Sequence, residues 1–227
     1  MAKALLNLYL LAYNAVSAAG WAFVLYLAAT TVWASYEQGK DVEAIARATW
    51  NAVEWPLKIV QTMAAMEIIH AALGFVRSPL GSTLIQVSSR LWLVWAINEL
   101  CPISRYQIGF PLMVLSWGLV EVPRYSFYAL NLYNLVPSFL FFLRYHLFMV
   151  LYPSGVAGEV LCLISALPYL QTGVYAIQMP NAHNVAISLY TVVLMSIVTY
   201  IPGLPVMYGH MLTQRNRAYS KTKAKTA

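Results

Sequence analysis

The sequence contains few charged residues. Asp, Glu, Lys and Arg together make up only 10% of its 227 residues, against about 25% in ordinary soluble domains. Hydrophobic residues make up 60%, and the mean hydropathy is +0.63. Such a chain cannot cover a water-facing surface with polar groups, which excludes a disordered chain and a typical soluble enzyme. The sequence therefore predicts a protein of the lipid bilayer.

Cysteine is also scarce, since the chain has only Cys101 and Cys162. They lie far apart, in apolar or helix-end contexts, and are predicted to be free structural thiols and not a disulfide or redox framework. The chain shows no internal repeat and no low-complexity segment, and its length suits one compact bundle. No metal site and no cofactor are expected.

Basic residues outnumber acidic ones by 14 to 8, which gives a net charge of +6. They are not gathered on one soluble face with interleaved aromatics, so nucleic acid is not expected as a partner. Five charged residues lie within residues 37–47 and five within residues 215–225. Both stretches are predicted to face water.

Long apolar stretches are the main positive signal, because about 20 apolar residues suffice to span a bilayer as a helix. We predict an all-α, polytopic membrane helix bundle with six or seven transmembrane helices in residues 1–212, followed by a basic cytosolic tail, residues 213–227. The first stretch is too long for a secretory leader and is expected to be retained. A polar loop at residues 37–41 should follow it, and then a short interfacial helix as far as Trp50. The expected stretches are residues 5–33, 55–76, 84–100, 108–130, 137–152, 156–177 and 184–207.

The basic tail predicts the orientation, because cytoplasmic flanks of membrane spans accumulate Lys and Arg. The C-terminus should be cytosolic and the loop at residues 178–183 luminal. Seven spans would make the N-terminus luminal and six would make it cytosolic; the sequence leaves both open. Lys223 and Lys225 stand fifth and third from the end, as in a dilysine retrieval signal of the endoplasmic reticulum, although a solvated basic tail explains them equally well.

Charged groups inside the apolar stretches are candidates for a site, since burying one costs about 2.5–3.5 kcal/mol on insertion scales. Glu67 and His70 share a helical face. Their spacing is typical of carboxylate-bridged metal bundles, but the chain lacks the second pair that such bundles need. A structural pair is favoured there, and likewise for Glu121 and Arg124. The full set is Glu67, His70, Arg90, Glu99, Glu121, Arg124, Arg144, His146 and Glu159.

Two Arg-Tyr steps, Arg124-Tyr125 and Arg144-Tyr145, lie in successive stretches. Because an arginine fork suits phosphate or carboxylate, either step could hold an anionic ligand. Hydrogen bonding between helices is the alternative, and both remain open.

The segment from Tyr152 to Glu159 places a phenol and a carboxylate seven residues apart around Pro153, Gly155 and Gly158. Proline and glycine together predict a break in the helix. Broken helices at membrane depth line cavities or are buried in protein. The alternative is a simple turn between spans, with Glu159 as a first-turn acid favoured by the helix dipole.

The sequence resembles the very-long-chain 3-hydroxyacyl-CoA dehydratases, the family once called protein tyrosine phosphatase-like, and in particular its plant PASTICCINO-type members. The resemblance covers nearly the whole chain. It is carried by Glu67-Ile-Ile-His70, Gln86-Val-Ser-Ser-Arg90, Arg124-Tyr-Ser-Phe127, Arg144-Tyr145, Leu151-Tyr-Pro-Ser-Gly-Val-Ala-Gly-Glu159, residues 184–208 and Arg215.

This resemblance implies an enzyme of the endoplasmic-reticulum membrane that removes water from (3R)-3-hydroxyacyl-CoA, giving trans-2-enoyl-CoA in the third step of fatty-acid elongation. It implies membrane lipids as surroundings and the condensing enzyme and the two reductases of the cycle as partners. The family's catalytic tyrosine and glutamate match Tyr152 and Glu159. Phosphatase activity is predicted to be absent, because a Cys-x5-Arg loop would need arginine at Gln107 or Pro168.

Dehydration needs a base for the C2 proton and an acid for the C3 hydroxyl. We expect Glu159 to be the base and Tyr152 the acid, although a deprotonated tyrosine near Arg144 could reverse the roles. Backbone N–H groups at the predicted helix break should help to stabilise the thioester oxygen. The CoA part should enter from the cytosolic side, and Arg105 and Arg215 are further residues that could lie near it. A transporter and a non-catalytic scaffold are the competing functions. The residues expected to bind substrate are Arg144, Tyr145, Arg124, Tyr125, His70 and Gly155.

Overall fold

The computed structural model describes residues 2–177, 179 and 186–226, and the side chains of residues 3–177, 179 and 186–220. Apart from turns and one short antiparallel ribbon, the described chain is helical. Its helices are α1 (Ala2–Glu37), α2 (Val42–Met63), α3 (Ala65–Ala72), α4 (Leu80–Leu91), the π-helix η1 (Trp92–Asn98), the 3₁₀-helix η2 (Pro102–Arg105), α5 (Gly109–Asn131), α6 (Ser138–His146), α7 (Phe148–Gln171) and α8 (Leu189–Thr226), and its strands are β1 (Ala176–Ile177) and β2 (Ile187–Ser188).

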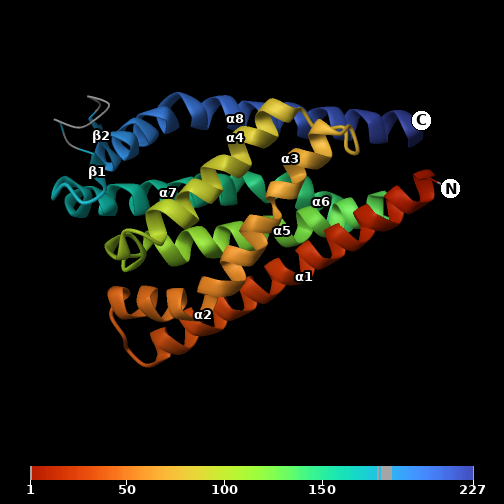
Figure 1. Ribbon diagram of the computed structural model, residues 1–227. Coiled ribbons are helices and arrows are strands. Elements are labelled where there is room, and N and C mark those ends of the chain that lie inside the picture. The colour runs from red at the N-terminus through yellow and green to blue at the C-terminus, as the bar shows by residue number, and fades with distance from the viewer. Residues whose placement is uncertain (1, 178, 180–185, 227) are drawn as a thin grey trace.

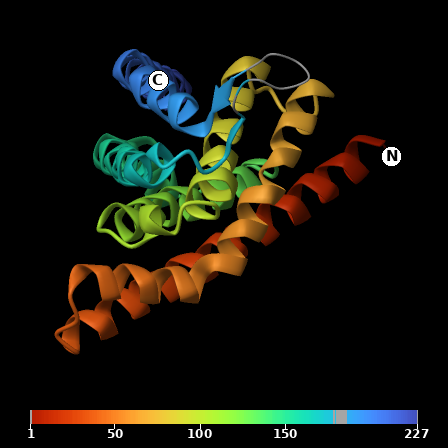
Figure 2. The ribbon, with the colours of Figure 1, turned by 60° about the vertical axis from the view of Figure 1, so that its left-hand side comes forward.

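The helices run back and forth along an elongated bundle (Figure 1). The start of α1 and the end of α8 lie toward one end of the molecule, which we call the terminal end. The turn between α1 and α2, residues 38–41, lies at the opposite end, which we call the turn end. Figure 2 looks more nearly along α7 and α8, which lie side by side, and shows α1 and α2 inclined to them.

The core forms where α1 packs on α2 and α5, and where α5 packs on α7. Small residues bring these helices together, as they do in membrane bundles. A Cβ added to Gly118 of α5 would lie only 3.0 Å from Cβ of Leu25 in α1. Large apolar side chains fill the space between these contacts, among them Trp21, Leu57, Phe110, Met113 and Leu163.

The helices agree with the predicted apolar stretches best near the N-terminus and in α5. The stretch at residues 5–33 lies within α1, and residues 108–130 nearly coincide with α5. The stretch at residues 55–76 is divided at Ala64 between α2 and α3, and residues 84–100 change from α-helix to π-helix. The interfacial helix expected to end at Trp50 is wrong, because α2 continues without interruption to Met63. The predicted loop at residues 178–183 lies largely outside the described residues.

The predicted helix break between Tyr152 and Glu159 is also wrong. α7 is continuous from Phe148 to Gln171, and Leu147, which separates it from α6, itself has helical backbone angles. The glycines serve close packing instead: a Cβ on Gly158 would lie 2.6 Å from the carbonyl oxygen of Gly109 in α5. Tertiary contact between α5 and α7 therefore outweighs the weak helix propensity of this segment, and no break frees backbone N–H groups there.

Among the described residues, three helices are long and apolar enough to cross a membrane: Lys3–Glu37, Phe148–Gln171 and Leu189–Ser220. This agrees with an all-helical membrane protein; the number of six or seven spans remains a prediction.

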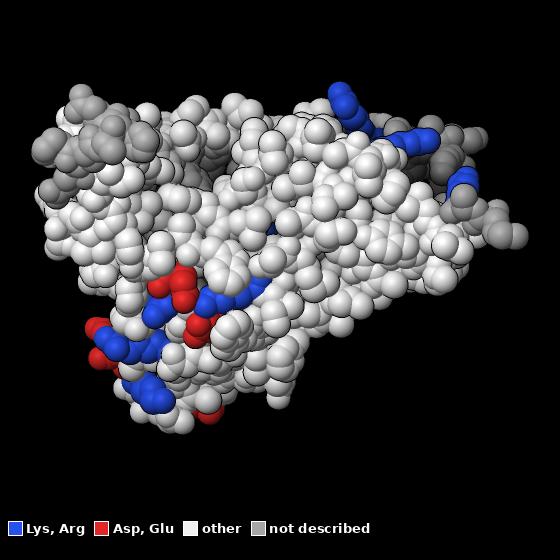
Figure 3. Space-filling model, in the orientation of Figure 1, with Lys and Arg blue, Asp and Glu red and all other residues white. Residues whose placement is uncertain are grey.

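Charged side chains lie mainly toward the two ends of the bundle, and the face in Figure 3 is largely uncharged between them. The turn end carries both signs, with exposed Glu37, Lys40, Asp41, Glu43 and Arg47, the residues that the sequence predicts to face water. At the terminal end, the exposed charged residues among those whose side chains are described are all basic: Lys3, Arg77 and Arg217.

Candidate active site

Glu159 lies near the middle of α7 and is held by one donor on each carboxylate oxygen. Trp117 of α5 donates its indole N–H to Oε1 at 2.8 Å, and the hydroxyl of Tyr200 in α8 donates to Oε2 at 2.7 Å. Trp117 is only 3% exposed, whereas Glu159 and Tyr200 are half-buried. Three helices thus fix the orientation of this carboxylate.

Tyr152 lies two helical turns before Glu159, on the same face of α7 and about 10 Å away along the helix axis. It is half-buried, and its ring centroid lies 6.4 Å from that of Tyr208 in α8. Among the described residues, nothing forms a hydrogen bond with its hydroxyl. The phenol that touches Glu159 is therefore Tyr200, and the hydroxyl of Tyr152 is left available to another molecule.

Arg90 of α4 connects this face of α7 to a buried charge network. Its guanidinium carbon lies 5.0 Å from the ring centroid of Trp117, a cation–π contact, and its charge interacts with both Tyr152 and Glu159. Its Nη1 donates to Glu121 of α5, which is 1% exposed. Arg90 thus stacks on Trp117, the residue that donates to Glu159.

The network continues from Glu121 through Arg124 to Glu67. Arg124 donates from Nε to Glu121 at 2.5 Å and from Nη2 and Nη1 to Glu67 at 2.7 and 3.0 Å. Glu67 also accepts from the hydroxyl of Tyr125. With Arg90 the network has two cations and two anions, so its net charge is zero. The predicted structural pair of Glu121 and Arg124 is confirmed.

The predicted pair of Glu67 and His70 is wrong, because each bonds to a different helix. His70 is 2% exposed, and its Nε2 forms a hydrogen bond with the hydroxyl of Tyr9 in α1 at 2.8 Å. The ring of Tyr13 lies 4.8 Å from the imidazole. The side chains of His70, Arg124 and Tyr125 thus join helices, and their binding of substrate remains a prediction.

The other predicted binding residues lie in α6 and α7. Arg144 donates from Nη2 to the hydroxyl of Tyr128 in α5 at 3.0 Å. The ring of Tyr145 packs against Phe141, with centroids 4.8 Å apart. Gly155 lies on α7 beside Trp117, where a Cβ would be 3.7 Å from the indole Cδ1. Of the predicted set, Gly155 is therefore the one that borders the surroundings of Glu159.

Arg105 makes its described contacts with other residues than Tyr152 and Glu159. Its Nη1 donates to the carbonyl of Asn98 at 3.0 Å and lies 3.8 Å from Glu99, and its guanidinium covers the ring of Trp50. These contacts account for the arginine within the protein. They give it no part in the arrangement around Glu159.

Both cysteines are free and buried, as predicted. Burial raises the pKa of the Cys101 thiol to about 11. A catalytic cysteine needs the opposite, a thiolate stabilised by nearby positive charge. Among the described residues, no cluster of three or more His, Cys, Asp or Glu could hold a metal ion.

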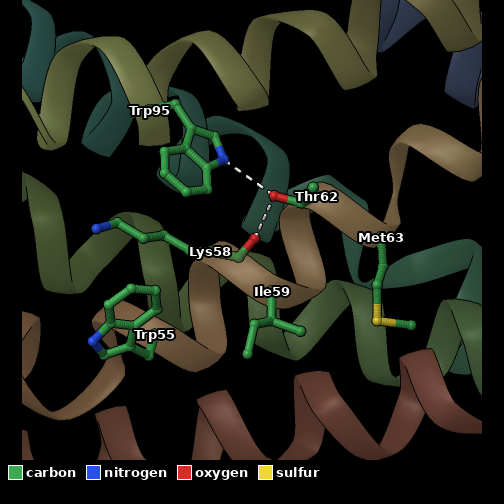
Figure 4. A pocket seen from close by; sticks show the side chains of 6 residues that line it. All are labelled: Trp55, Lys58, Ile59, Thr62, Met63 and Trp95. Atoms are coloured by element: carbon green, nitrogen blue, oxygen red, sulfur yellow. Dashed lines mark hydrogen bonds between the residues drawn. The ribbon is translucent and has the colours of Figure 1, made fainter.

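A groove of about 360 Å³ lies between α2 and η1 (Figure 4). It is lined by Trp55, Lys58, Ile59, Thr62, Met63 and Trp95. A second groove of about 600 Å³ includes Arg47 and Tyr106 at the turn end. Neither groove includes Tyr152 or Glu159.

Sequence reasoning missed Trp117 and Tyr200, the two residues that hold Glu159. Aromatic residues are common in membrane spans, so neither residue type was informative by itself. Tyr200 does lie within residues 184–208, one of the segments that carry the family resemblance. For Trp117 the sequence offered no signal, since its role depends on the crossing of α5 and α7.

Comparison with known proteins identifies the relatives of this chain. The family model described as "Protein tyrosine phosphatase-like protein, PTPLA" matches residues 61–221. The very-long-chain (3R)-3-hydroxyacyl-CoA dehydratase hpo-8 of Caenorhabditis elegans is 43% identical over 92% of this chain and 93% of its own length. The rice dehydratase PASTICCINO 2A is 41% identical over 98% and 97%, and PASTICCINO 2 of Arabidopsis thaliana is 40% identical over 96% and 95%. No solved structure matches the chain.

Proposed function

The chain belongs to the protein tyrosine phosphatase-like family, and from this membership we propose that it is a very-long-chain (3R)-3-hydroxyacyl-CoA dehydratase, a hydro-lyase of fatty-acid elongation. Its relatives that carry this name match it over nearly their whole length. Its substrate is then an acyl-CoA thioester. Its partners are the condensing enzyme and the two reductases of the same cycle.

One observation carries the proposal of a catalytic pair: Tyr152 and the fixed carboxylate of Glu159 share a face of α7, and both are partly accessible. Two turns of helix separate them, about 10 Å along the axis. C2 and C3 of a substrate are proposed to lie between the two side chains. A phenol and a carboxylate are the two groups that dehydration requires.

In the proposed mechanism, Glu159 acts as an ionised base and removes a proton from C2. The electron pair of that C–H bond forms the C2–C3 double bond, and the C3–O bond breaks. Tyr152 donates its phenolic proton to the departing hydroxide, which leaves as water. The glutamic acid then returns its proton to the tyrosinate, directly or through water, and both groups regain their starting forms.

Negative charge grows on the thioester oxygen as C2 loses its proton, and a preorganised cation stabilises it. Arg90 is proposed for this task, because its guanidinium stacks on Trp117, which donates to Glu159. Arg144, Tyr145 and Gly155 are proposed to contact the substrate on the same side of the bundle. Arg124, Tyr125 and His70 would act mainly by holding the helices in place.

We further propose six membrane crossings in the endoplasmic reticulum, with both termini cytosolic. The exposed charged residues described at the terminal end are basic, and the cytosolic flanks of membrane spans are rich in Lys and Arg. This placement brings the start of α7, and so Tyr152, near the cytosol. CoA then remains in water while the acyl chain extends between helices toward the bilayer interior.

The decisive experiment supplies the purified protein with a long-chain 3-hydroxyacyl-CoA and follows the enoyl product. Tyr152→Phe and Glu159→Gln should each lower kcat at least 100-fold, because each removes one proton-transfer group. Tyr36→Phe and Glu37→Gln serve as matched controls, since both residues are exposed at the turn end. They should retain the parent rate. If both site variants stay folded and turn over like the parent, the acid–base pair is wrong.

A further inference from the structure

A second group of polar side chains lies toward the terminal end, where α6 packs against the C-terminal half of α8. Arg215 of α8 donates from Nη2 to Nε2 of His146 in α6 at 3.0 Å. Its guanidinium carbon lies 5.4 Å from the ring centroid of Tyr219. Arg144 lies two residues before His146 on the same short helix.

The hydrogen bonds of His146 fit one tautomer of the ring. Its Nδ1 lies 3.0 Å from the carbonyl oxygen of Phe142, which can only accept, so Nδ1 carries a hydrogen. Nε2 is then the lone-pair atom that accepts from Arg215. A neutral histidine therefore orients Arg215 without reducing its positive charge.

Neither Arg144 nor Arg215 forms an ion pair with a carboxylate among the described residues. By contrast, Arg90, Arg105 and Arg124 all do. Nε is buried without a hydrogen-bond partner in Arg144 and Arg215, as it also is in the ion-paired Arg105, so the missing carboxylate is what distinguishes the first two. Partly buried cations are normally paired, because an uncompensated charge is costly. The guanidinium of Arg215 is thus free of a carboxylate in the described part of the chain and able to bind an anion from outside the protein.

The distance between Arg215 and the proposed catalytic pair matches the length of the pantetheine arm of a CoA thioester. α8 presents three contacts in succession: Tyr200 with Glu159, Tyr208 with Tyr152, and Arg215 with His146. Along the helix, Arg215 lies about 10 Å beyond Tyr208 and about 22 Å beyond Tyr200. The pantetheine arm has about thirteen bonds between sulfur and the first phosphorus, a little over four extended residues or roughly 15 Å. A thioester between Tyr152 and Glu159 therefore brings its phosphates to the level of Arg215.

We propose that Arg215, oriented by His146, binds the phosphates of the CoA nucleotide, a role that rests on the proposed dehydratase function. Arginine forks bind phosphate oxygens through two parallel hydrogen bonds. Tyr219, which is 37% exposed, offers a ring face for the adenine beside them. Phosphate of an anionic lipid headgroup has the same chemistry, and the experiment separates the two sources.

The test compares two substrates with the same acyl group, the CoA thioester and the pantetheine thioester, which lacks the nucleotide. Arg215→Gln should raise KM for the CoA thioester about tenfold or more and change kcat less than twofold, because one charge-assisted phosphate contact is lost. Its kinetics with the pantetheine thioester should match those of the parent. Arg217→Gln removes the same charge from the same helix at an exposed position, about 200° away from Arg215 around the helix axis. It should leave KM and kcat for both thioesters unchanged.

A second experiment tests the phosphate site independently of catalysis. It measures the binding of desulfo-CoA and of adenosine 3′,5′-bisphosphate by calorimetry in phosphatidylcholine nanodiscs. If the parent binds both compounds, Arg215→Gln does not, and no turnover occurs, the phosphate site stands and the dehydratase assignment falls. If Arg215→Gln lowered kcat/KM equally for both thioesters, or left KM for the CoA thioester unchanged, the proposed phosphate site would be wrong. It would also be wrong if the parent bound neither compound but needed Arg215 for binding vesicles with anionic lipid.

Discussion

At the scale of single residues, polar groups inside this bundle are satisfied by partners on other helices. Glu121 accepts from Arg90 and Arg124, and His70 bonds to Tyr9. Glu159 follows the same rule but is bound only by uncharged donors, the indole of Trp117 and the phenol of Tyr200. Fixed donors hold a base in position without neutralising it through a full counter-charge.

The hydroxyl of Tyr200 predicts a specific kinetic defect. Tyr200→Phe removes the donor to Oε2 of Glu159, so the carboxylate loses one of its two fixed contacts. A hydrogen bond to a charged group is worth about 1.5–3 kcal/mol, so kcat should fall roughly 10- to 100-fold. KM should change less than threefold, since no substrate contact is removed. Steady-state kinetics with a long-chain 3-hydroxyacyl-CoA measures both quantities.

Tyr190→Phe is the matched control for that substitution. Tyr190 lies on the same helix, packs against the core and takes no part in the contacts of Glu159. It should leave both constants near the parent values. A Tyr200→Phe protein with the parent kcat would show that Trp117 alone positions the carboxylate.

At the scale of helices, α7 combines close packing with exposure of a reactive face. Gly158 allows the backbone of α5 to approach α7, and Trp117 then reaches Glu159. The helix continues through Pro153 and the two glycines because contact with α5 supports it from one side. A segment with poor helix propensity is thus held helical by its neighbour.

Substitution of Gly158 tests this packing. Gly158→Ala should destabilise the protein by several kcal/mol, because the added Cβ would lie 2.6 and 2.7 Å from backbone atoms of Gly109 and Met113 that cannot move independently. Gly209→Ala in α8 meets nothing within 4 Å and should be neutral or slightly stabilising, because alanine favours a helix by about 1 kcal/mol. Unfolding in detergent by denaturant titration compares the two. Equal stabilities would mean that α5 and α7 are not tightly packed.

At the scale of the whole molecule, charge is distributed unequally between the two ends. The exposed basic residues of the terminal end lack acidic neighbours, whereas the turn end mixes both signs. A membrane protein with this asymmetry should place the terminal end in the cytosol. Substrate would then approach from the compartment that contains acyl-CoA.

Cysteine labelling in sealed microsomes tests this topology. Single substitutions Lys3→Cys and Ser220→Cys should react with a membrane-impermeant maleimide, and Lys40→Cys should react only after the membrane is permeabilised. The native thiols Cys101 and Cys162 are buried and should give little background. Protection of Lys3→Cys with labelling of Ser220→Cys would indicate an odd number of crossings and contradict six.

Some features of this protein follow from the sequence alone. Low charge and long apolar runs determine a helical membrane protein, because unpaired backbone groups are too costly in hydrocarbon for other structures. The motif residues from Glu67 to Glu159 identify the family before any contact is known. The assignment of the chemistry to Tyr152 and Glu159 is therefore a prediction from the sequence, which the assay of the two variants tests.

Tertiary structure decided what occupies the space around those residues. The sequence predicted a broken helix at Pro153, but the crossing of α5 and α7 keeps it intact. Glu159 is bound by Trp117 and Tyr200, which lie 42 and 41 positions away from it in the sequence. Arg215 and His146, which also bond to each other, are 69 positions apart. Local propensity and spacing describe neighbours along one helix, whereas these contacts depend on how different helices pack, and that is a property of the folded bundle.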